Sequence, residues 1–600
     1  MVTDRMIAFF EARARGGVAM IVLDGPCFDY PDTLKGSIHL RMDEEEHVKG
    51  LQRLLLAIQS NGCRAFTQMD YPSMKAVDEG TLGAKEKKGK WVLPLLEEAT
   101  TEELERIVSK MSMGASSIKE IGYDGIELQA NYGAFISLLL SPLTNMRRDK
   151  YGGSLENRSR FLIEAVRGIK AQVGDDYPLM IKYGADERID GGFDLGEAKV
   201  VAAWLEEAGA DAFLVTSGNK KTKNYLLPSF TLPKGVNIEI ASEVKKVVGV
   251  PVVSTGKIGD AQLIDDILTE DKADFIAMTR ALIADPEFVN KYAKGSVEDI
   301  RGCIYCLDDC ADKGAENIGR ACTVNPYAGL ESVFKLEAID KIEKVWVVGG
   351  GPAGMQAAIV LSKRGHSVEV FEKTNELGGL FNLAHLAPYK DEVIEANRYL
   401  RHMVNKYAIP VHLETEVDEK MVLESMPDAV VIAAGATQRK PAIKGIEISN
   451  VIGAREFLES DHVTDKEVVV IGGGDVGCEV ADIAGNDSKV TIIEILDEVL
   501  PKMKSLQRDN LLTRLKKKDV DILLSTEISL ITEDFVRIKN KEGERDIVSG
   551  TVIYAIGCDS KKDLATRLEG KIDVHTIGDA AIPGNLGEAL RSAVRAAIEI

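Results

Sequence analysis

The sequence VWVVGGGPAG, residues Val345–Gly354, indicates how the second half of the chain folds. Four apolar residues run directly into a glycine-rich turn, as in a buried strand followed by a tight turn and a helix. Gly349, Gly351 and Gly354 form the pattern G-x-G-x-x-G. Glycines at these places let the backbone approach a pyrophosphate, which the N-terminus of the following helix stabilises. The stretch therefore predicts a dinucleotide-binding βαβ unit.

A second copy of the pattern occurs further along the chain. Gly472, Gly474 and Gly477 follow the expected strand Val468–Ile471 and precede an expected helix. In each copy the next expected strand ends in an acidic residue. These residues are Glu372 after Ser367–Phe371 and Glu494 after Lys489–Ile493. A carboxylate at this place accepts hydrogen bonds from a ribose hydroxyl and favours NAD over NADP.

Four cysteines precede the first glycine turn with the spacing C-x2-C-x3-C-x11-C. They are Cys303, Cys306, Cys310 and Cys322. Zinc accepts four thiolates, usually as two C-x2-C pairs. Three ligands in one short run with a distant fourth is the more usual layout for an iron–sulfur cluster. The spacing favours the cluster and leaves zinc as the alternative.

Upstream of the cysteines, short β-branched runs alternate with amphipathic helices. This order predicts an α/β fold with a parallel sheet that closes into a TIM-type (β/α)8 barrel. Only seven strands are clear, and the chain opens on a helix, Asp4–Arg15, so the first strand of the barrel is missing. We therefore expect that the natural protein starts upstream of Met1. The expected strands are Ala19–Leu23, Ala65–Met69, Gly125–Leu128, Leu179–Lys182, Ala212–Thr216, Val250–Ser254 and Phe275–Met278.

Composition excludes several classes of protein. The chain has 600 residues, a formal net charge of −21 and an apolar content of 45%. An acidic surface repels phosphate backbones, so we expect no nucleic-acid partner. No apolar run is long enough to cross a bilayer, and the N-terminus is too charged for a signal peptide. The eight cysteines do not form a secreted disulfide pattern, which predicts a cytoplasmic protein; a homo-oligomer is left open.

Three further motifs carry a resemblance to a known family. They are LSPLTNMRRDKYGGSLENRSRF at Leu140–Phe161, RALIADP at Arg280–Pro286, and the cysteine run that ends in CTVNP. With the two glycine turns, almost the whole chain resembles the NADH:flavin oxidoreductases that join an old-yellow-enzyme-type barrel to an FAD/NAD module. Members include 2,4-dienoyl-CoA reductase, 2-enoate reductase and trimethylamine dehydrogenase.

The resemblance implies FMN in the barrel, a [4Fe–4S] cluster, and FAD reduced by NADH. It implies five segments. These are an FMN-binding barrel at 1–300, an iron–sulfur segment and linker at 301–342, an FAD domain at 343–445 and 566–600, and an NAD domain at 446–565. Within the FAD domain, Gly378–Gly379 and the Ala434–Gly435 crossing match the family. Asp579 matches the residue that contacts the FAD ribityl chain, with a helix N-cap as the alternative.

Residues for FMN carry over by position in the motifs. Gln68 would contact the flavin pyrimidine edge, and Lys182 stands where relatives usually have Arg, close to the N1 end of the flavin. Two late turns would hold the FMN phosphate, namely Gly256 with Lys257 and Thr279 with Arg280. The alternative is that Lys182 and Arg280 are ordinary charges at strand ends.

The catalytic residues depart from the family. Gln129 and Tyr132 replace the two histidines that bind the substrate oxygen, and Ala134 replaces the tyrosine that protonates the substrate. Tyr132 and Tyr183 are therefore candidate proton donors, although Tyr132 could merely pack against the flavin.

The leading hypothesis is an NADH-dependent reductase of activated C=C bonds in an unsaturated carbonyl or acid substrate. Electrons would pass from NADH to FAD, then to the cluster and to FMN. The alternatives are a dehydrogenase or desaturase that runs in the opposite direction, and an inactive barrel that serves electron transfer.

Overall fold

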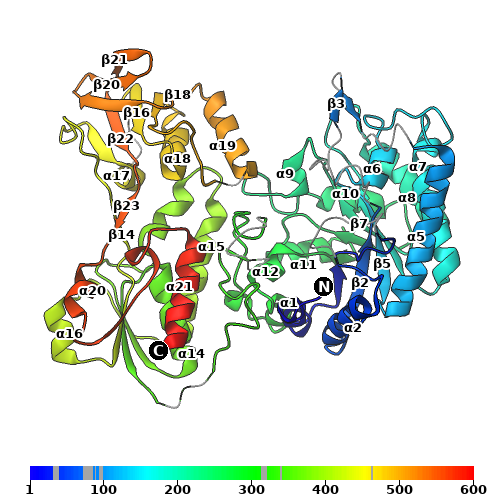
Figure 1. Ribbon diagram of the computed structural model, residues 1–600, viewed down its shortest axis with the longest axis horizontal. Coiled ribbons are helices and arrows are strands. Elements are labelled where there is room, and N and C mark those ends of the chain that lie inside the picture. The colour runs from blue at the N-terminus through cyan, green and yellow to red at the C-terminus, as the bar shows by residue number, and fades with distance from the viewer. Residues whose placement is uncertain are drawn as a thin grey trace. The chain divides into compact units, whose positions relative to one another are not determined.

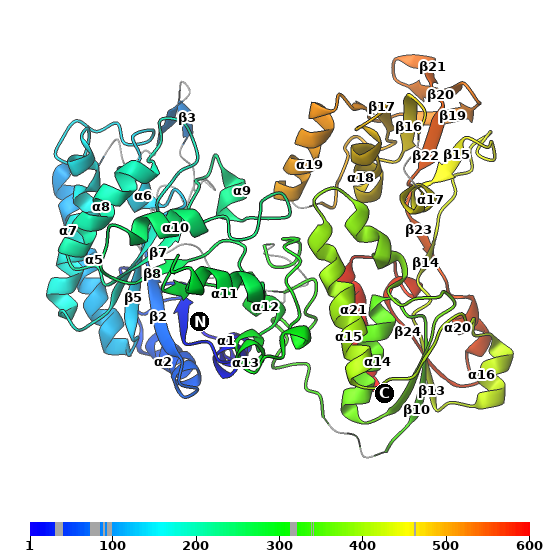
Figure 2. The ribbon, with the colours of Figure 1, turned by 180° about the vertical axis from the view of Figure 1, so that it is seen from behind.

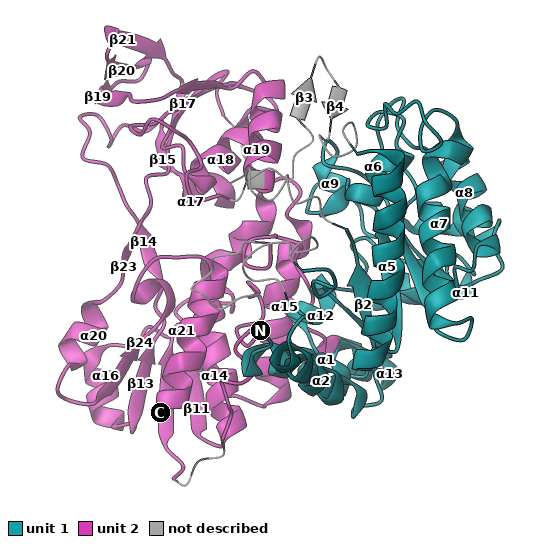
Figure 3. Ribbon diagram, turned by 45° about the vertical axis from the view of Figure 1, so that its right-hand side comes forward, with its two compact units in different colours: residues 1–297 teal, residues 298–600 magenta. Residues whose placement is uncertain are grey.

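The computed structural model describes residues 1–30, 40–71, 85–87, 90–92, 99–311, 321–337, 339, 341–460, 464–503 and 505–600, without the side chains of 85–87, 90–92 and 505. These residues form two compact units, Met1–Val297 and Glu298–Ile600 (Figure 3). Each unit is described by itself below.

The first unit is built on a parallel sheet whose strands follow one another in chain order. All seven strands expected from the sequence are confirmed. They are β1 (Met20–Leu23), β2 (Arg64–Met69), β5 (Gly125–Ala130), β6 (Leu179–Gly184), β7 (Ala212–Thr216), β8 (Val252–Ser254) and β9 (Phe275–Ile276). In the part of the chain that the structure describes, no further strand pairs with β1 or β9. A short antiparallel pair, β3 (Lys85–Lys87) and β4 (Lys90–Val92), is separate from this sheet.

Helices cover the outer face of this sheet (Figures 1 and 2). The helices that contribute to the core on this face are α1 (Asp4–Arg15), α2 (Glu45–Gln59), α5 (Thr101–Ile121), α6 (Phe135–Leu140), α7 (Leu155–Val173), α8 (Leu195–Glu207) and α10 (Ile238–Lys245). The unit also contains α9 (Lys223–Leu226), α11 (Ala261–Thr269), α12 (Arg280–Ala284) and α13 (Phe288–Ala293). The opposite face carries a smaller apolar cluster around Met180, Leu214 and Val253. Successive strand residues point to opposite faces, so two apolar layers flank the sheet, as in half of a barrel.

The second unit contains two five-stranded parallel sheets. The first has the order β12 (Val411–His412), β11 (Ser367–Phe371), β10 (Lys344–Val348), β13 (Ala429–Ile432) and β24 (Asp573–Thr576). Its helices are α14 (Pro352–Arg364), α15 (Ile394–Lys406), α16 (Glu419–Ser425), α20 (Asp563–Leu568) and α21 (Leu586–Glu599), with short 3-10 turns at η3 (Gly379–Leu386), η4 (Asp391–Val393) and η5 (Gly578–Ala580).

The second sheet has the order β15 (Val451–Gly453), β22 (Thr551–Tyr554), β16 (Glu467–Ile471), β17 (Lys489–Ile493) and β18 (Asp521–Leu523). Its helices are α17 (Ala454–Glu459), α18 (Asp475–Ala484) and α19 (Ser505–Lys517), and β19 (Glu527–Ile531), β20 (Phe535–Asn540) and β21 (Gly543–Val548) form a separate antiparallel sheet.

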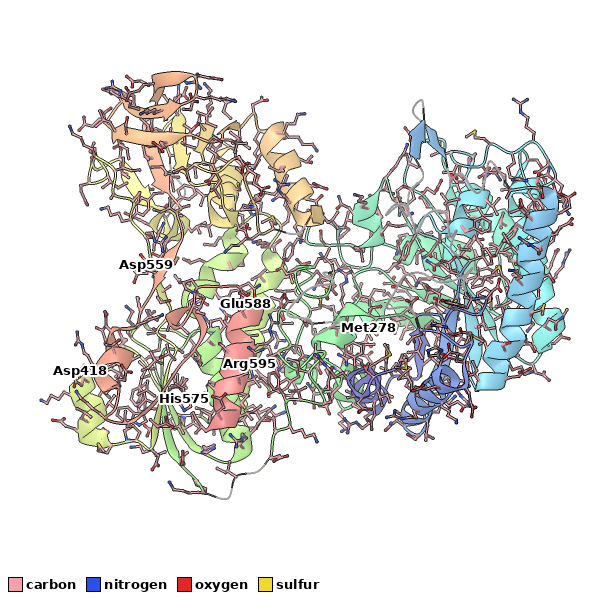
Figure 4. The ribbon with its side chains drawn as sticks, viewed as in Figure 1. Met278, Asp418, Asp559, His575, Glu588 and Arg595 are labelled. Carbon is pink, nitrogen blue, oxygen red and sulfur yellow. The ribbon has the colours of Figure 1, made fainter. Side chains whose placement is uncertain are left out.

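The two five-stranded sheets are nested in sequence. β24 belongs to the first sheet although it follows every strand of the second. The chain crosses between them through an antiparallel pair, β14 (Ala436–Gln438) and β23 (Cys558–Ser560). Figures 1 and 2 show this pair between the two sheets, and Figure 4 labels Asp559 on it. The predicted nesting of two Rossmann-like domains is confirmed, whereas the exact boundaries of the five segments stay predictions.

Candidate redox sites

The first glycine turn has the three features that a pyrophosphate site needs. Gly349 has φ +113°, which side chains rarely adopt. A Cβ on Gly351 would meet no atom within 4 Å, so this part of the backbone faces open space. A Cβ on Gly354 would lie 1.9 Å from the Gly349 carbonyl oxygen, so only glycine lets α14 pack this closely. These are the three roles of a dinucleotide turn.

The second glycine turn repeats this geometry. Gly472 has φ +105°, and a Cβ on Gly474 would again meet nothing within 4 Å. A Cβ on Gly477 would lie 2.0 Å from the Gly472 carbonyl oxygen. The two turns therefore have the same construction, and each can receive a dinucleotide.

Both acidic residues at the strand ends are buried and held by backbone amides. Glu372 accepts hydrogen bonds from the Gly350 amide at 2.7 Å and from the Thr374 amide at 2.9 Å. Glu494 accepts from the Gly473 amide at 2.5 Å and from the Leu496 amide at 2.8 Å. Each carboxylate is thus fixed beside its glycine turn, where a ribose would lie.

Two further predicted FAD residues lie beside the first turn. A Cβ on Gly379 would be 3.3 Å from the Gly351 Cα, and one on Gly578 would be 2.8 Å from the Ala353 side chain. The latter contact brings the neighbouring Asp579 to the first turn of α14. The helix N-cap considered for Asp579 is wrong, because Asp579 lies inside η5, whose N-cap is Ile577. The N-cap of α21 is Asn585, which forms a capping box with Glu588, labelled in Figure 4.

The cysteine segment is a tight loop with amide contacts to sulfur. Tyr305 and Leu307 have positive φ values of 52° and 59°, and the Tyr305 amide donates to Cys303 Sγ at 3.4 Å. Cys306 Sγ lies 3.3 Å from the Thr323 hydroxyl, next to Cys322. Hydrogen bonds to sulfur are typical around iron–sulfur ligands.

The positions of the sulfurs bear on how the four cysteines could bind a metal. Within the described ranges, the one group of three potential ligand atoms closer than 4.8 Å is formed by Asp43, Glu44 and His47. No three cysteine sulfurs are therefore that close together. A tetrahedral zinc with Zn–S bonds of about 2.3 Å would hold its sulfurs about 3.8 Å apart. The described cysteines are thus not arranged around a zinc-sized centre, and their role as iron–sulfur ligands stays a prediction.

A polar group lies at the carboxyl ends of β2, β5 and β6 in the first unit. Gln68 Nε2 donates to Glu127 Oε1 at 2.7 Å, and Lys182 Nζ lies 3.5 Å from the same oxygen. Burial opposes the charge of Lys182, but the Glu127 carboxylate and other neighbours outweigh it and raise the pKa of Lys182. Lys182 is therefore a fixed cation at this edge of the sheet.

Tyr132 and Gln129 lie at the same edge. Gln129 pairs with Lys182 in the register of β5 and β6, so the two side chains share a face. The Tyr132 ring centroid lies 5.6 Å from Lys182 Nζ, and its backbone has φ 60°. Burial raises the pKa of Tyr132, although Lys182 favours the ionised form. The tyrosine hydroxyl thus stays protonated and can donate a hydrogen bond.

The structure does not bring Tyr183 to this group, which corrects its proposed role as proton donor. Its side chain is completely buried, and its hydroxyl donates to the Ala198 carbonyl of α8 at 2.9 Å. The ring packs on Phe193 and Phe213. Because Tyr183 follows Lys182 directly in β6, it must point to the opposite face of the sheet.

The two predicted phosphate turns end neighbouring strands, since β8 pairs with β9. Gly256 has φ +106° and Lys257 has φ 59°. Lys257 is buried and donates to the Leu232 carbonyl at 2.7 Å, so its ammonium group is directed to the protein. Arg280 bonds the Pro228 carbonyl, and Thr279 is exposed.

Two residues at this edge were missed by the sequence analysis. Glu127, which holds both Gln68 and Lys182, could have been found because it points to the same face as Gln129 two residues later. Lys220 follows β7, and a Cβ on Gly133 would lie 3.5 Å from its Cγ. Burial lowers the pKa of Lys220, and the nearby charge of Asp70 partly offsets this lowering. Its place after a strand end was the available signal.

Comparison with known proteins agrees with this construction. Residues 1–299 match the NADH:flavin oxidoreductase / NADH oxidase family, and residues 343–582 match the pyridine nucleotide-disulphide oxidoreductases. The chain is 36% identical over 614 residues to an NADH oxidase from Thermoanaerobacter brockii, an alignment that covers 100% of this chain and 94% of the relative.

The chain belongs to the NADH:flavin oxidoreductase / NADH oxidase family.

Other members of this family are similar over most of their length. A cinnamate reductase from Clostridium sporogenes is 31% identical, with 84% of this chain and 78% of the relative covered. The solved structure of a 2-naphthoyl-CoA reductase in complex with 2-naphthoyl-CoA matches with a TM-score of 0.91 and 29% identity, covering 100% of this chain and 94% of that one. This NADH:flavin oxidoreductase is thus an enzyme with a flavin domain and a flavin/pyridine-nucleotide domain. No helix in its described part is long and apolar enough to cross a membrane.

Proposed function

We propose that this NADH:flavin oxidoreductase reduces an activated C=C bond in an unsaturated carbonyl, acid or acyl-CoA substrate at the expense of NADH. The observation that carries the proposal is the combination, in one chain, of two dinucleotide turns, four cysteines in one segment and a polar group at the strand edge where a flavin would bind. These residues form four candidate sites, and the path from NADH to the substrate would use all of them.

Each group of residues suits one cofactor. Gly349, Gly351 and Gly354, with Glu372, Gly379 and Asp579, would hold FAD. Gly472, Gly474 and Gly477, with Glu494, would hold NADH. The four cysteines would hold a [4Fe–4S] cluster, and Gln68, Lys182 and the turns at Gly256 and Thr279 would hold FMN. When bound, FAD accepts a hydride from NADH, the cluster transfers single electrons, and FMN delivers a hydride to the substrate.

The strand edge supplies what the substrate and the flavin require. Lys182 keeps a positive charge because Glu127 raises its pKa, so it can stabilise negative charge on a reduced flavin ring. Gln129 can donate an amide hydrogen to the substrate oxygen, and Tyr132 can donate its hydroxyl proton. The proton donor therefore comes from the loop after β5 rather than from Tyr183.

The relatives support this direction of reaction. The cinnamate reductase and the 2-naphthoyl-CoA reductase are both named for the reduction of conjugated acyl compounds. A relative named for the opposite direction, an N,N-dimethylglycine/sarcosine dehydrogenase, is also 30% identical, with 84% of this chain and 75% of the relative covered. The intact second glycine turn with Glu494 favours NADH as the electron source, and hence reduction.

The test is an anaerobic assay of the purified protein with NADH and cinnamate. Formation of 3-phenylpropanoate with equal consumption of NADH is expected. Cyclohexenone tests the unsaturated carbonyl class, and cinnamoyl-CoA tests the acyl-CoA class. N,N-dimethylglycine with a dye acceptor tests the opposite direction. Oxidation of dimethylglycine without reduction of any of the three unsaturated compounds would contradict the proposal.

A further inference from the structure

Arg591 joins the last helix to the cysteine segment through a buried ion pair. Its side chain is 3% exposed, and Nη1 lies 2.8 Å from Asp309 Oδ2, a carboxylate 7% exposed. Asp309 stands between Cys306 and Cys310 in the sequence. The guanidinium of α21 is thus directed into the middle of the cysteine loop.

A second contact, one turn earlier on α21, confirms how closely the helix approaches. A Cβ on Gly587 would lie 2.4 Å from Asp309 Oδ2 and 3.2 Å from the Thr323 Cα. Thr323 follows Cys322, and its hydroxyl lies 3.3 Å from Cys306 Sγ. The face of α21 that carries Gly587 and Arg591 therefore packs against backbone next to the cysteines.

One polar atom of Arg591 has no acceptor. The Nε atom is buried and makes no hydrogen bond to any residue that the structure describes. Buried donors are almost always paired, so this Nε–H is available to a group bound beside the cysteines. A cluster bound by four thiolates carries negative charge and exposed sulfur acceptors, which suits a guanidinium N–H.

We propose that Arg591 donates its Nε–H to a sulfur of the iron–sulfur cluster while Asp309 holds the other end of the guanidinium. This inference rests on the proposed function, because it requires the cluster. Hydrogen bonds to cluster sulfurs stabilise the more negative, reduced state and raise the reduction potential. Arg591 thus makes the cluster a better electron acceptor from FAD.

The test compares Arg591→Lys with wild type and with Arg595→Lys, all purified anaerobically. Arg595 is an exposed residue of the same helix, labelled in Figure 4. Iron per chain is measured, and the cluster potential is titrated by electron paramagnetic resonance without turnover. Lysine keeps a cation for Asp309 but lacks the Nε–H. We therefore expect a more negative potential in Arg591→Lys, or loss of iron with FAD retained, and no change in Arg595→Lys.

Asp309→Asn separates the hydrogen bond from the ion pair. This variant removes the carboxylate and keeps Nε, so its potential should not become more negative. An unchanged potential with full iron in Arg591→Lys would overturn the inference. An equal negative shift in Asp309→Asn would also overturn it. Wild-type protein without iron would reject both this inference and the proposed electron path, whereas the first two results leave that path intact.

Discussion

The side-chain amide of Gln68 donates a 2.7 Å hydrogen bond to Glu127, whose carboxylate is 1% exposed. An ionised carboxylate only accepts hydrogen bonds, so the NH₂ group of Gln68 faces Glu127 and its amide oxygen remains for another donor. The flavin pyrimidine ring carries such an N–H donor. Glu127 therefore orients Gln68 and stabilises the charge of Lys182 at the same time.

Glu127→Gln should weaken FMN binding. The variant removes the negative charge that supports Lys182, and its amide can present either a donor or an acceptor to Gln68, so Gln68 is no longer held in one orientation. The loss of a buried, charge-assisted hydrogen bond costs about 1–3 kcal/mol, which corresponds to about 5- to 150-fold weaker binding. Flavin fluorescence measures the dissociation constant, and Glu120→Gln, at an exposed position on α5, is the control. Equal affinities in the two variants would refute this role of Glu127.

Tyr132→Phe should lower kcat by about 100-fold, with FMN content unchanged, because the variant keeps the ring and removes the donor. The pKa of Tyr132 is raised above its ordinary value of about 10. The hydroxyl therefore keeps its proton at neutral pH and loses it only as the pH rises through that higher pKa. The Tyr132-dependent part of kcat should thus be flat from about pH 6 to 9. Tyr30→Phe, at an exposed tyrosine, is the control. A Tyr132-dependent decline that begins near pH 8 would show that another group donates the proton.

Gly354→Ala and Gly477→Ala should each disable one dinucleotide site. The new methyl group would clash with the carbonyl oxygen of Gly349 or of Gly472. Gly354→Ala should lose FAD, while Gly477→Ala should keep FAD and lose its rapid reduction by NADH. Flavin content and stopped-flow absorbance measure the two effects. In the control Gly50→Ala the nearest atom would be 3.4 Å away, and both properties should persist. Loss of the same cofactor in both variants would contradict two separate sites.

Cys306→Ser should block electron flow to FMN while NADH still reduces FAD, because a serine hydroxyl is a poor ligand for iron. Cys558→Ser changes a half-buried cysteine outside the segment and should behave as wild type. Stopped-flow spectra resolve the two flavins after NADH is mixed in. FMN reduction at the wild-type rate in Cys306→Ser would show that the cluster is not the carrier.

Much of the fold could be predicted because its signals are local. The glycine turns need positive φ, open space and close packing at fixed positions, so their residues alone indicate the geometry found at Gly349 and Gly472. Helix α1 and strands β11 and β17 have the predicted bounds, since charge and β-branched runs limit them.

The remaining features depend on contacts between distant segments. Arg591 and Asp309 are 282 positions apart, and no pattern in the sequence connects them. Lys220 can be identified as a residue of this strand edge only from the structure, in which its side chain lies beside Gly133. Tyr183 is different, because strand alternation already places it opposite Lys182. That prediction failed because two neighbouring residues of one strand were assigned to the same face.

An anaerobic NADH titration of the purified protein, with flavin and iron quantified in the same sample, tests the proposed electron path most directly. We expect one FMN, one FAD and about four irons per chain, all reduced by NADH. FAD and iron without FMN, or FMN that NADH does not reduce, would contradict the proposed path from NADH to the substrate.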